Sequence, residues 1–283
     1  MLKYLIFGNG YIGNKFKTYF GDDAIISTQR IKSSNDVGTE ILVHDPEVVI
    51  NCMGRTGKPN VDWCEDHKME TAKGNIAIPL MVAEACLEFK KYMVHISSGC
   101  IYEGDNGGKG WTEEDEPNFG GSYYSRTKAL SEKILKEFPI LQIRIRIPLD
   151  DIPSDRNVIN KIIKYAKIVE IENSITYLPD LMRVTDKLID SRAVGIYNVV
   201  NKGAVKYSFV LDKYKEIVNP EHTYELFTPA ELDAATTAKR SNCVLSIEKL
   251  EKEGIHIRPI EEAVVKALTN YKENQIQYNM ERE

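Results

Sequence analysis

The chain begins with a short apolar run that is followed at once by closely spaced glycines. Residues 2–7 predict a buried strand, and the stretch Gly-Asn-Gly-Tyr-Ile-Gly follows, with a helix expected from about residue 11. Glycines allow a tight turn and let a pyrophosphate approach the helix N-terminus, where backbone N–H groups and the helix dipole favour an anion. A plain turn can show the same pattern, but its place after a first strand favours a dinucleotide site at Gly8, Gly10, Tyr11, Ile12 and Gly13.

Strand and helix patterns alternate through the first half of the chain. Strands are expected at 24–27, 47–52, 92–97 and 141–147, and helices at 75–90 and from 122. This order predicts right-handed crossovers and an α/β fold of the Rossmann type, a doubly wound parallel sheet covered on both faces. We assign residues 1–148 to the cofactor domain, with a strand near 195–200 rejoining its sheet, and residues 149–283 mainly to a smaller C-terminal substrate-binding lobe. A helix is expected at 157–169, and the polar tail after about residue 270 is expected to be detachable.

Charge and cysteine content narrow the class of function. A net charge of -5 over 283 residues argues against a broad nucleic-acid or anionic-membrane surface, so phosphate groups must be met by local Arg, Lys and backbone N–H groups. Five cysteines without a C-x-x-C pair disfavour disulfides and structural zinc, and the histidines show no metal-ligand spacing. No segment reaches membrane-spanning length. We expect a cytoplasmic protein without a metal.

The end of the second strand bears on which dinucleotide is bound. Residues 26–32 read Ile-Ser-Thr-Gln-Arg-Ile-Lys and carry no carboxylate for a ribose 2′-hydroxyl. Arg30 among hydroxyls suits a 2′-phosphate, although an exposed loop arginine is often only solvated. NADPH is therefore favoured, with NADH left open.

A tyrosine and a lysine four residues apart follow the turn at Gly120-Gly121-Ser122. This spacing places Tyr124 and Lys128 on one helix face, where the ammonium is expected to lower the pKa of the phenol. Tyr124 could then give a proton to a carbonyl oxygen while hydride arrives from a nicotinamide. Such pairs are common on surfaces, and the upstream glycine turn makes this one informative.

A serine and a cysteine stand at the end of the strand at 92–97. In an extended chain Ser98 and Cys100 point to the same side, towards the cleft. Ser98 could be a second donor to the carbonyl oxygen. A carbonyl held this way acidifies hydrogens on both flanking carbons, so a thiolate at Cys100 could remove one and an acid on the opposite face could return it. The plain alternative is an inert, buried thiol.

Several longer stretches carry a family resemblance. They are residues 54–65 (GRTGKPNVDWCE), 99–102 (GCIY), 113–119 (EEDEPNF), 124–128 (YSRTK), 156–157 with 161, and 240–242 (RSN). Over nearly its whole length the chain resembles the extended short-chain dehydrogenase/reductases, and among them the plant-type nucleotide-rhamnose synthase/epimerase-reductases. The resemblance implies 3,5-epimerisation and NADPH-dependent 4-keto reduction of UDP-4-keto-6-deoxy-D-glucose to UDP-L-rhamnose. The first glycines depart from the family's commoner G-x-x-G-x-x-G by one residue.

The same resemblance implies roles for individual residues. Ser98, Tyr124 and Lys128 match the reductase centre, and Cys100 with Lys161 matches the epimerising pair. Asn51, Gly54 and Asn75 match the cofactor side of the site. Arg55, Asn157 and Arg240 match the substrate side, with Arg240 near the nucleotide diphosphate.

Two alternatives and several partners remain to be considered. The chain could be a 4-keto reductase only, similar to dTDP-4-dehydrorhamnose reductase, or a non-catalytic NADP-binding regulatory subunit. The resemblance implies a separate upstream 4,6-dehydratase and a homodimer that pairs through the helices after residues 75 and 122; UDP and dTDP substrates are not distinguished. The acidic run at 113–116 is expected to be a solvated loop face.

Overall fold

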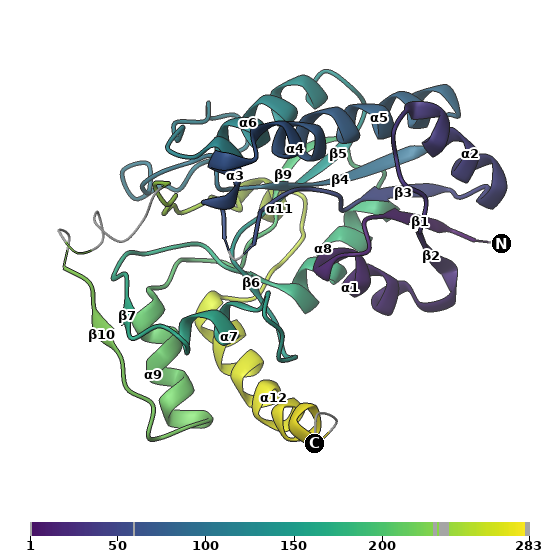
Figure 1. Ribbon diagram of the computed structural model, residues 1–283. Helices are drawn as coiled ribbons and strands as arrows, with labels where there is room; N and C mark the ends of the chain where they lie inside the picture. Colours follow the sequence, from purple (N-terminus) through teal and green to yellow (C-terminus); the bar gives the residue numbers. More distant parts are fainter. Residues whose placement is uncertain (1, 59, 229–230, 232–237, 281–283) are drawn as a thin grey trace.

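A six-stranded parallel sheet forms the centre of the molecule (Figure 1). The computed structural model describes residues 2–58, 60–228, 231 and 238–280. The strand order is β2-β1-β3-β4-β5-β9, and each neighbouring pair is parallel. The predicted Rossmann-type α/β fold is thereby confirmed. The strands are β1 (Tyr4–Phe7), β2 (Ala24–Ser27), β3 (Val48–Asn51), β4 (Tyr92–Ser98), β5 (Leu141–Ile145) and β9 (Gly195–Asn198).

Successive side chains of each strand are buried against helices on opposite faces of the sheet. In β1, Tyr4 and Ile6 belong to one apolar cluster, and Leu5 and Phe7 belong to the other. Because side chains alternate along a strand, an apolar strand of this kind requires cover on both faces. Figure 1 shows α1 (Tyr11–Phe20) and α8 (Leu178–Asp190) on one face, with α2 (Ser34–His44), α5 (Ile78–Glu88) and α6 (Tyr123–Leu135) on the other.

Short elements connect several of the larger ones. A 3₁₀ turn, η1, covers Gly21–Asp23. Two short helices, α3 (Trp63–Asp66) and α4 (Lys68–Ala72), lead into a π-helical turn, η2 (Lys73–Ala77), that runs on into α5. The single helix expected at 75–90 is therefore a π-turn followed by a regular helix. Such turns inside helices frequently mark functional sites.

The second half of the chain builds a smaller lobe with its own apolar core. This core is formed mainly by residues of 149–177, 205–214 and 260–271. The strand expected near 195–200 is β9, which pairs with β5 of the main sheet. The elements of this half are β6 (Pro148–Leu149), α7 (Val158–Ile162), β7 (Lys167–Ile168), β8 (Thr176–Tyr177), α9 (Tyr207–Ile217), β10 (Glu225–Leu226), α11 (Glu248–Lys252) and α12 (Ile260–Met280).

Two predictions for the C-terminal half are wrong. The helix expected at 157–169 ends at Ile162, and the chain then enters β7. The tail expected to detach after residue 270 continues as α12, in which Tyr271 is buried and Asn274 donates a hydrogen bond to the Asp151 carbonyl at 3.1 Å. A polar stretch with one buried face is indistinguishable in sequence from a solvated tail when its partners lie far away in the chain, as Tyr214 and Asp151 do here. The sequence also predicts a loop around residue 229, and this position lies outside the described residues.

Candidate active site

A cavity of about 990 Å³ opens at the carboxyl ends of the central strands. In open α/β sheets this edge, where the strand order reverses, is the usual place for ligands. The first helix turn, the loops after β3 and β4, helix α6, residues 145–148, helix α7 and residues 239–242 form its walls. The predicted site residues that line it are Gly10, Tyr11, Ile12, Gly54, Arg55, Asn75, Ser98, Cys100, Tyr124, Lys128, Lys161 and Arg240.

The glycine turn is shaped by close backbone packing. Gly8 has φ +114, and a Cβ there would lie 2.9 Å from the Cys52 carbonyl carbon. A Cβ at Gly13 would lie 1.9 Å from the Gly8 carbonyl oxygen, whereas one at Gly10 would meet nothing within 4 Å. Gly8 and Gly13 therefore permit the turn itself. Gly10 leaves the N-terminus of α1 open to the cavity, where an anion could approach the backbone N–H groups.

Helix α1 is also fixed to the second lobe. The Tyr11 hydroxyl donates to Asp150 at 2.7 Å, and the Lys15 ammonium lies 2.5 Å from the same, almost fully buried carboxylate. Tyr11 is thus held by a charge-assisted hydrogen bond beside the glycine turn.

Ser98, Tyr124 and Lys128 lie together where β4 ends against the start of α6. All three are buried, and the Lys128 ammonium donates to the Ile96 carbonyl at 3.3 Å. Burial lowers the pKa of Lys128 to about 8. Burial also raises the pKa of Tyr124, with a further rise from nearby Cys100 that outweighs the lowering by its hydrogen bond to Ser98. The expected lowering of the phenol pKa by Lys128 is therefore wrong for the free protein, because desolvation dominates. A protonated Tyr124 remains suited to donate a proton.

Cys100 reaches the same cavity by a different backbone route from the one expected. The chain turns after β4, and the Cys100 N–H donates to the Ser98 hydroxyl at 3.1 Å. The Cys100 sulfur accepts a hydrogen bond from an Arg146 Nη at 2.8 Å. Lys161 lines the cavity from α7, and burial, aided by Arg156, lowers its pKa. The structure thus brings a thiol and a half-buried amine to the cavity that also holds Tyr124.

Two asparagines expected on the cofactor side brace the loops behind the site. Asn75, in η2, accepts from the Arg55 N–H at 2.7 Å and donates to the Arg55 carbonyl and to Thr127 of α6. Asn51 is fully buried, with its amide nitrogen 3.1 Å from His95 Nδ1 and its oxygen accepting from the Met53 N–H. Asn51 does not line the cavity, and its contacts hold the turn after β3.

Two other predicted residues lie outside the cavity wall, and a third lines it. Asn157 is fully buried, and its amide caps α7 at the Ile159 N–H and donates to two backbone carbonyls. Its polar atoms are thus committed to the fold, so the prediction that it binds substrate is wrong. Arg30 is exposed on the loop after β2 and does not line the cavity. Arg240 does line it, paired with Asp62 at 2.7 Å.

The cavity wall is strongly basic although the chain is acidic overall. Its charge suits a ligand with several phosphates, because basic walls of low dielectric concentrate anions. Among the lining residues that the structure describes, Asp62 is the single carboxylate. The basic ones are Arg55, Lys128, Arg146, Arg156, Lys161, Lys164, Lys167, Lys239 and Arg240.

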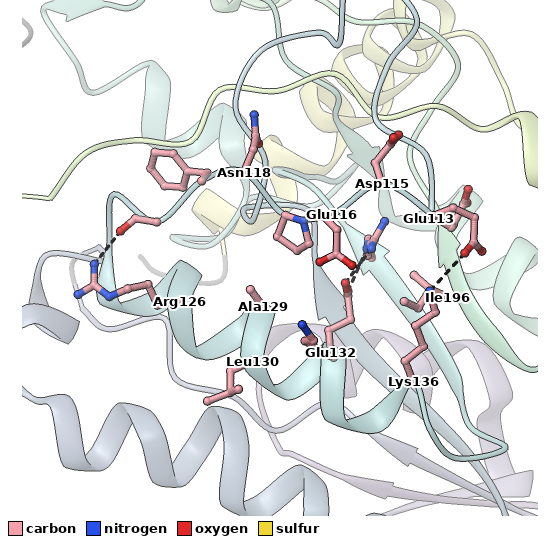
Figure 2. Close-up of a pocket in the computed structure, with 16 residues that line it drawn as sticks. Glu113, Asp115, Glu116, Asn118, Arg126, Ala129, Leu130, Glu132, Lys136 and Ile196 are labelled. Carbon is pink, nitrogen blue, oxygen red and sulfur yellow. Dashed lines mark hydrogen bonds and ion pairs between the residues drawn. The ribbon is translucent and has the colours of Figure 1, made fainter.

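A second, smaller cavity of about 440 Å³ lies between α6 and the acidic loop at 113–120. Figure 2 shows Asp115, Glu116 and Asn118 on the loop, and Arg126 and Glu132 on the helix. None of the predicted site residues lines it. The expectation that the acidic run is wholly solvated is wrong at Glu113, which is buried and accepts a hydrogen bond from the Asn198 N–H at 2.8 Å.

Sequence reasoning missed Arg146, and it gave no role to Arg156 although that residue belongs to one of the resembling stretches. Arg146 is buried just beyond β5, and Arg156 reaches the loop after β3, 3.3 Å from the Thr56 hydroxyl. The alternation Arg144-Ile145-Arg146 at the end of an apolar strand was the available signal, because buried arginines need dedicated partners. Within the described residues, no cluster of His, Cys, Asp or Glu is placed to hold a metal, and no helix is long and apolar enough to cross a membrane.

Comparison with known proteins places this site in context. The family profile of the RmlD substrate binding domain matches residues 5–273. A bifunctional dTDP-4-dehydrorhamnose 3,5-epimerase/reductase of Arabidopsis thaliana is 36% identical over 93% of this chain and 91% of its own length. A trifunctional UDP-glucose 4,6-dehydratase/3,5-epimerase/reductase of the same plant is 37% identical, and the chain spans 41% of its length.

Solved structures show the same fold. The UDP-rhamnose synthase of Acanthamoeba polyphaga mimivirus has a TM-score of 0.89 and 30% identity, covering 95% of this chain and 99% of that one. A dTDP-4-dehydrorhamnose reductase of Bacillus anthracis in complex with NADP has a TM-score of 0.80 at 20% identity, covering 94% and 97%.

Proposed function

Because the chain belongs to the RmlD substrate binding domain family, we propose that it is an NADPH-dependent 4-keto reductase of nucleotide sugars that also epimerises its substrate at C3 and C5. The observation that carries the proposal is the convergence of Ser98, Tyr124, Lys128, Cys100 and Lys161 on one basic cavity. NADP in the solved reductase complex supports the choice of cofactor, and so does the open turn at Gly10.

In the reduction, the protein holds and protonates the substrate carbonyl. Bound NADPH supplies the hydride to the carbonyl carbon. The Ser98 hydroxyl and the Tyr124 hydroxyl hold the oxygen, and Tyr124 gives its proton to the alkoxide as it forms. The Lys128 ammonium stabilises the resulting phenolate, which is then protonated from solvent. Burial of all three groups strengthens these interactions because the local dielectric is low.

In the epimerisation, the same two hydroxyls that hold the carbonyl oxygen also make the hydrogens on the neighbouring carbons acidic. The Cys100 thiolate takes the proton from a carbon next to the carbonyl, and the C–H electron pair moves into an enolate whose oxygen Ser98 and Tyr124 hold. The Lys161 ammonium returns a proton to the opposite face, and the enolate pair forms the new C–H bond. The thiol and the neutral amine then exchange protons with solvent, so the step is balanced without a cofactor.

Reduction alone is the alternative function, because a solved structure with the same fold is named as a dTDP-4-dehydrorhamnose reductase. Cys100 and Lys161 are the residues that distinguish the two. Their shared cavity and the bifunctional relative support epimerisation. A non-catalytic NADP-binding role is disfavoured by the intact Ser98, Tyr124 and Lys128.

The test is incubation with UDP- or dTDP-4-keto-6-deoxy-D-glucose and NADPH, with product configuration read by NMR. We expect L-rhamnose configuration and NADPH consumption. Cys100→Ser should still reduce the ketone but give no inverted product, and Tyr124→Phe should lose reduction by about a hundredfold or more. Full rhamnose output from Cys100→Ser would leave reduction as the function, and no NADPH consumption with either sugar would contradict the whole proposal.

We further propose that a separate 4,6-dehydratase supplies the keto sugar and that two copies of the chain pair through α5 and α6. Leu87 and Leu130 on these helices are 43% and 49% exposed, which supports such pairing. Light scattering of wild type and of Leu130→Lys tests the pairing, because the variant should be monomeric.

The free state of all five cysteines suits the proposed cytoplasmic location.

A further inference from the structure

Arg146 is a buried arginine whose guanidinium points at the reactive thiol. Its side chain follows β5 and is 3% exposed. One Nη donates to the Cys100 sulfur at 2.8 Å, and the other donates to the Asn173 side-chain oxygen and to the Ser241 carbonyl at 2.6 Å. Three segments distant in sequence therefore hold the guanidinium in one orientation.

The guanidinium has no carboxylate partner. Across the described ranges, none of the ion pairs includes Arg146, and its acceptors are an amide oxygen, a backbone carbonyl and a sulfur. Its Nε is buried without a hydrogen-bond partner. A permanently charged group in such a place requires an anion, since an uncompensated buried charge costs several kcal/mol. The Cys100 sulfur is the one contacting atom that can become that anion.

The other groups that face Cys100 favour the same ionisation. Lys128 of α6 and Lys161 of α7 interact with it as cations. Tyr124, Tyr207 of α9 and Cys243 also face it, and each is neutral at pH 7 because burial raises its pKa. The next residue, Ile147, has φ +38, a costly conformation for a β-branched residue, so the backbone beside Arg146 is held under strain.

We propose that Arg146 is a positioning residue that holds Cys100 as a thiolate in the resting protein, with the sulfur aimed into the cavity. The ionisation is a property of the free chain, whereas its use as a base rests on the proposed epimerisation. When the thiolate takes a proton, the guanidinium keeps its two oxygen acceptors. Arg146 therefore stays fixed while the charge beside it moves into the substrate enolate.

The test measures how fast iodoacetamide alkylates Cys100 in the free protein between pH 5.5 and 9.5, with the modified peptide read by mass spectrometry. Wild type should titrate with a midpoint at least about one pH unit below the value of about 8.5 for an ordinary cysteine. Arg146→Met should move the midpoint to about 8.5 or above and slow alkylation at pH 7 about tenfold or more. Cys100→Ser should abolish the fast-reacting thiol.

Matched variants distinguish the effect of Arg146 on the alkylation midpoint of Cys100 from the effects of the other cations. Arg156→Met removes a lining arginine that contacts residues 56–57 and should leave the midpoint near wild type. Arg146→Lys should give an intermediate midpoint. A wild-type midpoint at or above 8.5 would overturn the proposal without any variant, and so would a midpoint that moves with Lys161→Met but not with Arg146→Met. A low midpoint combined with no deuterium exchange into any 4-keto sugar would instead contradict the epimerase function alone.

Discussion

At the residue scale, burial of the charged Lys128 side chain lowers the stability of the folded protein. The residue is 4% exposed, and its ammonium has the Ile96 carbonyl as its hydrogen-bond acceptor. Burial lowers its pKa from 10.5 to about 8. At neutral pH the folded protein therefore carries a charge that would be better solvated in the unfolded chain. The proposed reduction accounts for this cost, because it needs that charge beside Tyr124.

We predict that Lys128→Met abolishes reduction while it raises the free energy of unfolding at pH 7 by about 1–3 kcal/mol. Between about pH 8 and 10.5 the unfolded lysine still holds the proton that the folded one has lost, so this group's contribution to wild-type stability rises with pH across that window. The stability difference between variant and wild type should shrink accordingly. Urea denaturation at pH 7, 9 and 10.5 checks this, and a pH-independent difference would contradict it.

The chemistry-bearing residues differ in how far sequence could identify them. Tyr124 and Lys128 were predictable because their spacing alone places them on one helix face. Ser98 and Cys100 were predictable because they follow a recognisable buried strand. Arg146 was missed because its partners come from residues 100, 173 and 241, and no local pattern encodes contacts of that separation.

At the element scale, the β1–α1 turn separates two roles of glycine. A Cβ at Gly13 would lie 1.9 Å from a backbone oxygen, while the space around Gly10 is open. Gly13→Ala should therefore destabilise the protein by about 3 kcal/mol or more. Gly10→Ala should change stability by less than about 0.5 kcal/mol yet weaken NADPH binding, because its methyl group would stand where the pyrophosphate approaches. Thermal unfolding and fluorescence titration with NADPH measure the two effects, and equal destabilisation by both substitutions would contradict this assignment.

Helix α7 is a short element that depends on one cap. Its five residues carry Lys161, and Asn157 ties its start to the backbone of residues 150 and 152. We predict that Asn157→Ala lowers stability by about 2–3 kcal/mol and lowers solvent deuterium exchange into the sugar more than it lowers NADPH oxidation. Exchange followed by NMR, beside spectrophotometric NADPH oxidation, checks this. Equal losses would show that α7 serves both reactions.

The main-sheet elements were predictable and the short elements of the second lobe were not. Apolar runs of strand length alternating with helical stretches identify a parallel sheet. By contrast, α7 spans Val158–Ile162 and β7 spans Lys167–Ile168, and elements this short contain too few repeats of a helix or strand pattern to be recognised. Tertiary contacts decide where such elements end.

At the scale of the whole molecule, α12 closes the second lobe. Tyr271 is 1% exposed, and its ring packs edge-on against Tyr214 of α9 with centroids 6.5 Å apart. We predict that Tyr271→Ala costs about 3–5 kcal/mol, whereas Tyr271→Phe, which keeps the ring, costs about 1–2 kcal/mol. Chemical denaturation measures both. A near-neutral Tyr271→Ala would mean that the C-terminal helix is dispensable.

The pairing of Asp62 with Arg240 joins residues 178 positions apart in the chain across the cavity wall. A phosphate that bonds to the two Nη groups of Arg240 would compete with the carboxylate that already accepts from both, so the observed affinity would be the difference between two attractions. The same carboxylate would be available to the guanidinium again when a charged product leaves. Such a pair would favour release of the product over its retention.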